Sequence, residues 1–125
     1  MELYTSYYNR AQYSDTSEFA LFRISASAPK WFSKKAYPLE YLYPRWGLIE
    51  DYKNGIITEE EYVAEYSQRF NDRMREELLA IMENVCKAEG VTKAMLLCWE
   101  GKGKFCHRHP AGAWLDPEYT EWIGI

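Results

Sequence analysis

The run Ala94–Trp99 (AMLLCW) restricts the possible folds more than any other part of the sequence. A continuous apolar run of this length is typical of a parallel strand that is covered on both faces. It is followed by a loop with two glycines, Gly101 and Gly103, and then by a short helix that we expect to reach Leu115. We therefore predict an α/β fold, in which a small, mostly parallel sheet is flanked by helices in three layers, in a Rossmann-like arrangement.

Local signals mark two of the helices. Thr58 and Glu61 match a capping box, so a helix is expected to follow Thr58. A second helix is predicted over residues 75–88, and Gly90 ends it. The remaining expected elements are a first strand at residues 3–8 that opens into a loop, a second strand at 19–25, a turn of helix and a loop at 38–46, a helix at 47–53 and an edge strand within 119–125.

Length and composition bound the organisation of the chain. With 125 residues, of which 47% are hydrophobic and 27% charged, one globular domain spanning residues 1–125 is expected. The formal net charge of -4 makes stable binding to duplex DNA unfavourable, because that mode needs a basic surface. The aromatic fraction of 17% indicates an aromatic core or a stacking surface, and composition alone does not choose between them.

The terminal sequence and the cysteines indicate a compartment. The start Met1–Tyr4 lacks the basic and apolar regions of a secretory signal, and no window approaches the roughly 18 apolar residues of a membrane span. We therefore expect a cytoplasmic protein without membrane contact. The three cysteines form no paired framework, which fits a reducing compartment, and a disulfide between Cys98 and Cys106 stays open.

The segment from Cys98 to His109 is dense in reactive groups, and it follows a predicted parallel strand. Loops at the carboxyl ends of such strands, together with helix N-termini, form the usual ligand sites of α/β proteins. We therefore place the site at the carboxyl ends of the first, second and third strands. Its candidate groups are two thiols (Cys98, Cys106), one carboxylate (Glu100), two imidazoles (His107, His109) and the cations Lys102, Lys104 and Arg108.

Each of the main candidates has a chemical role and a structural alternative. Arg108 is predicted to bind an anion such as phosphate, or else to pair with Glu100 as a clamp. Glu100 is a candidate general acid, general base or nucleophile, and otherwise holds its own loop closed. His107 suits a proton shuttle, or otherwise packs its ring and hydrogen-bonds a neighbouring carbonyl. Cys106, close to a helix start and to cations, is a candidate thiolate nucleophile or redox thiol.

A second wall of the same cleft is expected from the loop Ser25–Lys30 (SASAPK), which offers hydroxyls, amides and a lysine. The alternative is a plain surface connection. Aromatic side chains near these loops suit base stacking or the core equally well. The ligand-binding candidates besides Arg108 are Cys98, which is otherwise a small buried residue, and Arg23, Ser25, Ser27, Lys30, Asn9, Arg10 and Tyr4.

The C-terminal motifs resemble a known family. Leu96–Glu100 (LLCWE) followed by Phe105–Arg108 (FCHR) is similar to the signature of domain of unknown function 488, a strand ending in Leu-Cys-x-Glu and then Cys-His-Arg at a helix start. The segments Tyr4–Tyr8, Ile24–Phe32 and Asp51–Tyr62 support the likeness, which covers nearly the whole chain. The resemblance implies an α/β fold with a shared site, and it supplies no agreed reaction.

These observations lead to a functional hypothesis with alternatives. We expect an enzyme or ligand-binding domain for a phosphate-bearing small molecule such as a nucleotide, with hydrolysis or group transfer as the reaction if it is an enzyme. The alternatives are a binding module for a partner protein or nucleic acid, and a redox or metal site at Cys98 and Cys106. A zinc site with His107 or His109 has the right ligand types but not a usual spacing, so we assign no metal and no cofactor.

Overall fold

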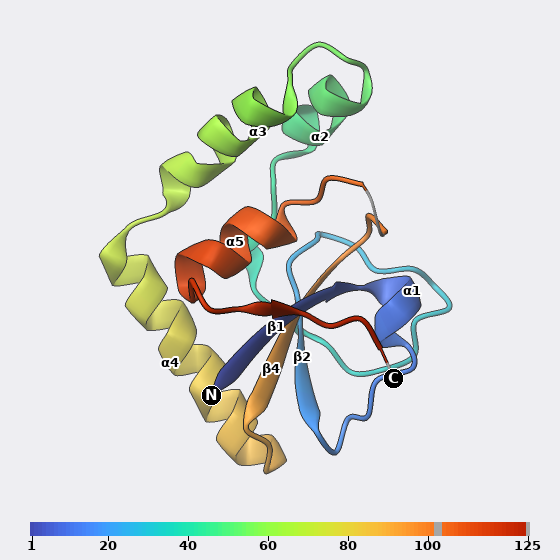
Figure 1. Ribbon diagram of the computed structural model, residues 1–125, viewed down its shortest axis with the longest axis vertical. Coiled ribbons are helices and arrows are strands. Elements are labelled where there is room, and N and C mark those ends of the chain that lie inside the picture. The colour runs from blue at the N-terminus through green and yellow to red at the C-terminus, as the bar shows by residue number, and fades with distance from the viewer. Residues whose placement is uncertain (102–103, 125) are drawn as a thin grey trace.

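The computed structural model describes residues 1–101 and 104–124, and it contains a sheet of five strands that all run parallel. The strand order is β3-β2-β4-β1-β5, with β4 at the centre (Figure 1). Lys102 and Gly103 of the predicted glycine loop lie outside the described residues. The strands are β1 (Glu2–Tyr7), β2 (Phe19–Arg23), β3 (Tyr37–Pro38), β4 (Lys93–Cys98) and β5 (Thr120–Glu121).

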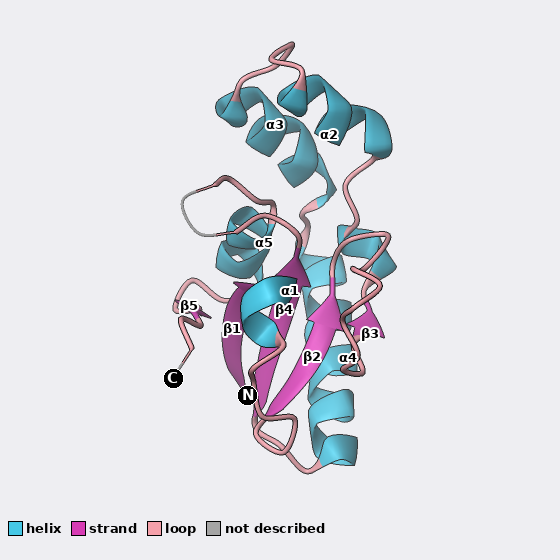
Figure 2. Cartoon of the chain, turned by 90° about the vertical axis from the view of Figure 1, so that its right-hand side faces the viewer, coloured by secondary structure: helices cyan, strands magenta, loops and turns pink. Residues whose placement is uncertain are grey.

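Helices cover both faces of this sheet, which confirms the predicted three-layer α/β fold. The long α4 lies against one face together with α5, and α1 lies on the opposite face (Figure 2). The pair α2 and α3 lies beyond the end of the sheet at which β2 and β4 stop. The helices are α1 (Tyr8–Ala11), α2 (Trp46–Lys53), α3 (Glu59–Tyr66), α4 (Asp72–Glu89) and α5 (Arg108–Leu115), with short 3-10 turns at Glu40–Leu42 and Ser67–Arg69.

Strand β4 has the burial expected of a strand covered on both faces. Its side chains from Ala94 to Cys98 are fully buried. Alternate residues point to opposite sides, so that Leu96 packs in the core with α4 and α5, while Met95 and Leu97 pack in the second core beside α1. The apolar run identified in the sequence is therefore the central strand of the sheet.

The predicted helix signals are also present. The Thr58 hydroxyl accepts a hydrogen bond from the Glu61 amide (3.1 Å), and the Glu61 carboxylate accepts one from the Thr58 amide (3.0 Å), so the capping box is complete. Gly90 ends α4 in the left-handed region with φ of 71°, where glycine is favoured. Helix α4 begins at Asp72, earlier than predicted, because the Asn71 side chain caps it by accepting from the Met74 amide (2.9 Å).

The boundaries after the first two strands differ from the prediction. Tyr8 does not end the first strand but begins α1, so Asn9 and Arg10 lie on a helical turn rather than in a loop. Strand β2 ends at Arg23, where the Arg23 guanidinium donates to the carbonyls of Ser25 (2.9 Å) and Ala26 (2.7 Å) and holds the chain in a bend.

Among the described residues, no helix combines the length and the apolarity needed to cross a membrane.

Candidate functional site

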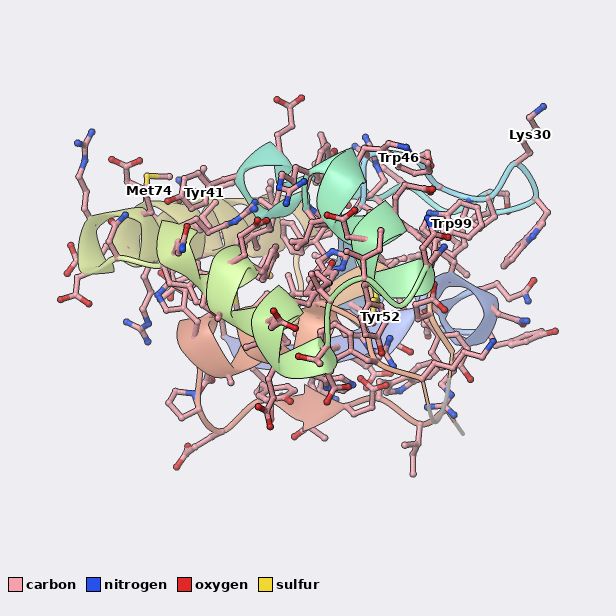
Figure 3. All side chains as sticks on the ribbon, turned by 90° about the horizontal axis from the view of Figure 1, so that it is seen from above. Lys30, Tyr41, Trp46, Tyr52, Met74 and Trp99 are labelled. Atoms are coloured by element: carbon pink, nitrogen blue, oxygen red, sulfur yellow. A yellow bond between two sulfur atoms is a disulfide. The ribbon has the colours of Figure 1, made fainter. Side chains whose placement is uncertain are left out.

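A cleft of about 1010 Å³ opens at the carboxyl ends of β2 and β4, under α2 and α3. Its position agrees with the site predicted from the sequence, except that β1 contributes no residue to its lining. Figure 3 shows Trp46, Tyr52 and Trp99 at the same end of the molecule. The lining residues are Ser25, Ala26, Ser27, Pro44, Trp46, Ile49, Tyr52, Lys53, Glu59, Tyr62, Trp99, Glu100, Lys104, Phe105, Cys106 and His107.

The cleft has an inner aromatic wall of packed rings. Phe105 lies edge-to-face against Tyr62, with ring centroids 4.9 Å apart, and against Tyr52, at 5.4 Å. Tyr52 and Tyr62 contact each other in the same manner at 5.6 Å. Such edge-to-face contacts fix the orientation of each ring. The wall is thus a rigid apolar surface formed jointly by α2, α3 and the segment before α5.

Two tryptophans at the cleft are largely exposed. Trp46, the first residue of α2, is 71% exposed, and Trp99, directly after β4, is 48% exposed. The Trp99 indole N–H donates to the Ser27 carbonyl (2.9 Å), so this ring has a fixed position and also links the loops after β2 and β4. Exposed apolar rings that border one cleft provide stacking surface for a planar ligand.

The charged groups of the cleft are balanced. Glu100 and Lys53 form a loose ion pair, with Oε1 and Nζ 3.7 Å apart, and both side chains keep contact with solvent. Lys104 and Glu59 also line the cleft. Exposed ion pairs of this kind contribute little to stability, so a ligand can compete for either partner at small cost.

His107 is buried at the base of the cleft, and its contacts are those of a packed, hydrogen-bonded ring rather than of a proton shuttle. Its Nε2 lies 2.6 Å from the Ile24 carbonyl oxygen, so this nitrogen carries the proton and donates it. Burial lowers the pKa of His107 from 6.5 to about 4, and the nearby cations Arg69 and Arg108 act in the same direction. The imidazole is therefore neutral near pH 7 and positions the start of α5 against the end of β2.

Arg108 does not line the cleft, although it follows His107 directly. The side chain is 2% exposed, and its Nε and Nη2 donate to the Glu121 carboxylate, with the shortest contact at 2.9 Å. Its Nη1 donates to the Glu100 backbone carbonyl (2.6 Å) and to Cys98 Sγ (3.1 Å). The predicted clamp to Glu100 is thus corrected: Arg108 bonds the main chain of Glu100, and its carboxylate partner is Glu121.

Cys98 and Cys106 are joined by a disulfide, the pairing that the sequence left open. Both residues are buried, and Cys106 borders the cleft. His107 Nδ1 lies 3.7 Å from Cys106 Sγ. The bridge connects the end of β4 to the residues just before α5, and so it closes the loop that carries Trp99, Glu100 and Phe105.

The loop after β2 forms the opposite wall, as predicted, through Ser25 and Ser27. Burial raises the pKa of Tyr8 to about 12, so its phenol stays protonated and lies in hydrogen-bond contact with Ser25 Oγ (2.5 Å). Ser25 Oγ in turn donates to the Ser27 carbonyl (2.7 Å), the same oxygen that receives the Trp99 indole. This network sets the shape of the wall.

Besides Arg108 and Cys98, five further ligand-binding candidates do not line the cleft. Arg23 supports the Ser25–Ser27 loop from behind through its carbonyl contacts. Lys30 is exposed and points outward (Figure 3). Asn9 is exposed on α1, Arg10 donates to the Trp122 carbonyl (3.2 Å), and Tyr4 packs edge-to-face on Phe19 (5.2 Å) in the second core.

A metal site is not formed by the histidines and cysteines that the structure describes. His109 Nδ1 lies 3.1 Å from the Tyr119 hydroxyl, and the ring does not line the cleft that His107 borders. Within residues 1–101 and 104–124, no group of three or more His, Cys, Asp or Glu side chains is arranged to hold a metal ion.

Sequence reasoning missed the contribution of α2 and α3 to the site. The sequence places Trp46, Lys53 and Tyr62 only within expected local elements. One signal was available: Trp46 stands directly after the proline-bearing segment, at a helix start where a large apolar side chain has no neighbours one turn earlier to pack against.

Comparison with known proteins adds no assignment. A scan against family models and searches of curated proteins and of solved structures found no significant match to this chain. The resemblance to domain of unknown function 488 therefore stays a prediction from the quoted motifs.

Proposed function

We propose that this chain binds a phosphate-bearing small molecule with a planar ring, of which a nucleotide is the simplest example, in the cleft at the ends of β2 and β4. The observation that carries the proposal is the pair of exposed indoles, Trp46 and Trp99, on a cleft that also contains two lysines. Bases stack on aromatic rings irrespective of their hydrogen-bonding edges. A ring between or against these indoles covers apolar surface that water otherwise contacts.

The phosphate is assigned to lysines rather than to Arg108. Lys53 and Lys104 line the cleft, and Lys53 is held only by its loose contact with Glu100. Each nitrogen of the Arg108 guanidinium already contacts an acceptor in Glu121, Glu100 or Cys98, so recruiting it would break a buried ion pair. The anion role predicted for Arg108 therefore passes to the two lysines.

Glu100 is the group proposed for proton chemistry if the ligand is turned over. Its carboxylate borders the cleft, and a phosphate that draws Lys53 away would leave it free to accept a proton from an attacking water or hydroxyl group. Hydrolysis or group transfer at a phosphoryl or glycosidic bond fits this arrangement. His107 is assigned a positioning role, because its donor nitrogen is engaged by Ile24.

Thermal-shift and calorimetric titrations with adenine and guanine nucleotides, sugar phosphates and inorganic phosphate test the proposal. A nucleotide at about 100 times its Kd should raise Tm by on the order of 10 °C. The shift should be lost in Trp46→Ala and in the double variant Lys53→Gln/Lys104→Gln. Trp31→Ala and Lys30→Gln are matched controls, because these exposed residues are of the same types but do not line the cleft. An equal shift in all variants, or none in the native protein, would refute the proposed site.

A binding module without turnover is the second candidate, and the exposed tryptophans favour it as well. Trp31 is 53% exposed, so indole surface extends beyond the cleft. Glu100→Gln distinguishes the two functions. In an enzyme this isosteric change should abolish turnover and leave ligand affinity within a few fold, whereas in a binding module it should change little.

A further inference from the structure

The two cysteines of the disulfide have different surroundings. Cys106 borders the cleft, which a small molecule can enter from solvent. Cys98 is fully buried at the end of β4, and the Arg108 guanidinium donates to its sulfur at 3.1 Å. One sulfur is therefore placed to meet an incoming reagent, and the other is placed next to a positive charge.

This asymmetry matches the needs of thiol–disulfide exchange. The attacking thiolate must reach one sulfur, and the reaction is faster when the other sulfur leaves as a stabilised thiolate. A cation beside a sulfur stabilises the negative charge that it acquires. Arg108 stays in place to do this because Glu121 fixes it from the opposite side. The Nδ1 of His107, which carries no proton because Nε2 does, lies 3.7 Å from the Cys106 sulfur and can accept a hydrogen bond from a Cys106 thiol.

We propose that Cys98 and Cys106 are a reversible dithiol–disulfide pair that exchanges with low-molecular-weight thiols through the cleft, with Cys106 as the attacked sulfur and Cys98 as the leaving and resolving sulfur. This inference does not rest on the proposed nucleotide ligand, because it needs the cleft only as a route of access.

The exchange balances with glutathione as the co-reactant. A glutathione thiolate attacks Cys106 Sγ, a mixed disulfide forms there, the Cys98–Cys106 bond breaks, and Cys98 leaves as a thiolate beside Arg108. A second glutathione thiolate then attacks the sulfur of the bound glutathione, which releases the Cys106 thiolate and oxidised glutathione. Two electrons pass from two glutathione molecules to the protein disulfide, and oxidation is the reverse sequence.

The third cysteine provides an internal control. Cys86 is buried on α4, where burial raises the pKa of its thiol, and its sulfur contacts the Lys93 carbonyl at 3.9 Å. It neither lines the cleft nor contacts Arg108. We expect Cys86 to remain a thiol under conditions that oxidise the pair.

Incubating the native protein in each buffer, then alkylating its thiols after denaturation so that the buried Cys86 also reacts, and counting them by intact mass tests the pair without any variant. As the oxidised fraction of a glutathione buffer increases, the number of free thiols in the folded protein should fall from three to one, and Cys86 should be the thiol that stays free. On reduction the number should rise to three again. Three free thiols in every buffer, or a bridge that reduced glutathione does not open in the folded protein, would overturn the proposal. Cys86→Ser, expected to pass from two free thiols to none, checks the assignment.

Single-cysteine variants test the direction of attack. With oxidised glutathione, Cys98→Ser should accumulate a mixed disulfide at Cys106, an order of magnitude faster than Cys106→Ser does at Cys98, because only Cys106 borders the cleft. Equal rates, or faster reaction at Cys98, would refute the assigned roles. Arg108→Lys, which retains the charge and loses the fixed fork of donors, should slow reduction by glutathione without changing the number of thiols in the pair.

Discussion

Acidification should destabilise the protein through His107. The unfolded chain takes up a proton on this residue near pH 6.5, whereas burial lowers the pKa in the folded protein to about 4. Between these values the unfolded state binds more protons, so the free energy of unfolding falls as the pH falls through this window. From the two pKa values, His107 alone removes about 2 kcal/mol at pH 5 and about 3 kcal/mol below pH 4, relative to pH 7.

The measurement is urea unfolding followed by tryptophan fluorescence at pH 7 and pH 5, in native protein and in His107→Gln. Glutamine keeps an amide donor near the Ile24 carbonyl but does not titrate. The decrease in the free energy of unfolding from pH 7 to pH 5 should therefore be about 2 kcal/mol smaller in the variant. His109→Gln is the matched control. Burial lowers the pKa of His109 too, but less of this side chain is buried, so most of the acid sensitivity should persist. An equal pH dependence in native protein and His107→Gln would refute the reasoning.

Three further experiments, with four substitutions, test local contacts of the fold, each by urea unfolding at neutral pH. Glu121→Gln leaves the buried Arg108 charge without its carboxylate and should cost about 3 kcal/mol, whereas Arg108→Met in the same chain should recover part of that loss. Thr58→Ala removes the side-chain half of the capping box and should cost about 1 kcal/mol. Gly112→Ala places a methyl group 2.9 Å from Thr5 Cγ2 and 3.0 Å from the Tyr119 ring, and it should cost about 2 kcal/mol. An unchanged midpoint would show that these contacts relax freely.

The sequence predicts the fold where the signals are local or continuous. The run at Ala94–Trp99 was identified as a buried parallel strand and is β4, shifted by one residue. The capping box at Thr58 and the stop at Gly90 were also correct, because each depends on neighbouring residues only. Helix α1 was missed because it is a single turn that follows β1 without a break.

The site was predicted less completely, because its contacts join distant parts of the chain. Glu100, Cys106 and His107 do meet at one cleft, since they all follow the same strand. The partner of Arg108 was not predictable from spacing, because Glu121 reaches it only after β5 has paired beside β1. Likewise, nothing local indicates that Trp46 lies across the cleft from the end of β4.

The strand order has a consequence for how the chain folds. β1 and β2 do not pair with each other, because β4 lies between them and pairs with both. Lys93 of β4 is the register partner of Glu2 in β1 and of Phe19 in β2. In a chain emerging from the ribosome, the backbone N–H and C=O groups along the edges of β1 and β2 that face β4 therefore stay unpaired until β4 is synthesised. Loops of this length must close before any strand pairing at the centre stabilises the sheet, so folding should be slow, and β4 is the segment whose arrival commits the chain to its structure.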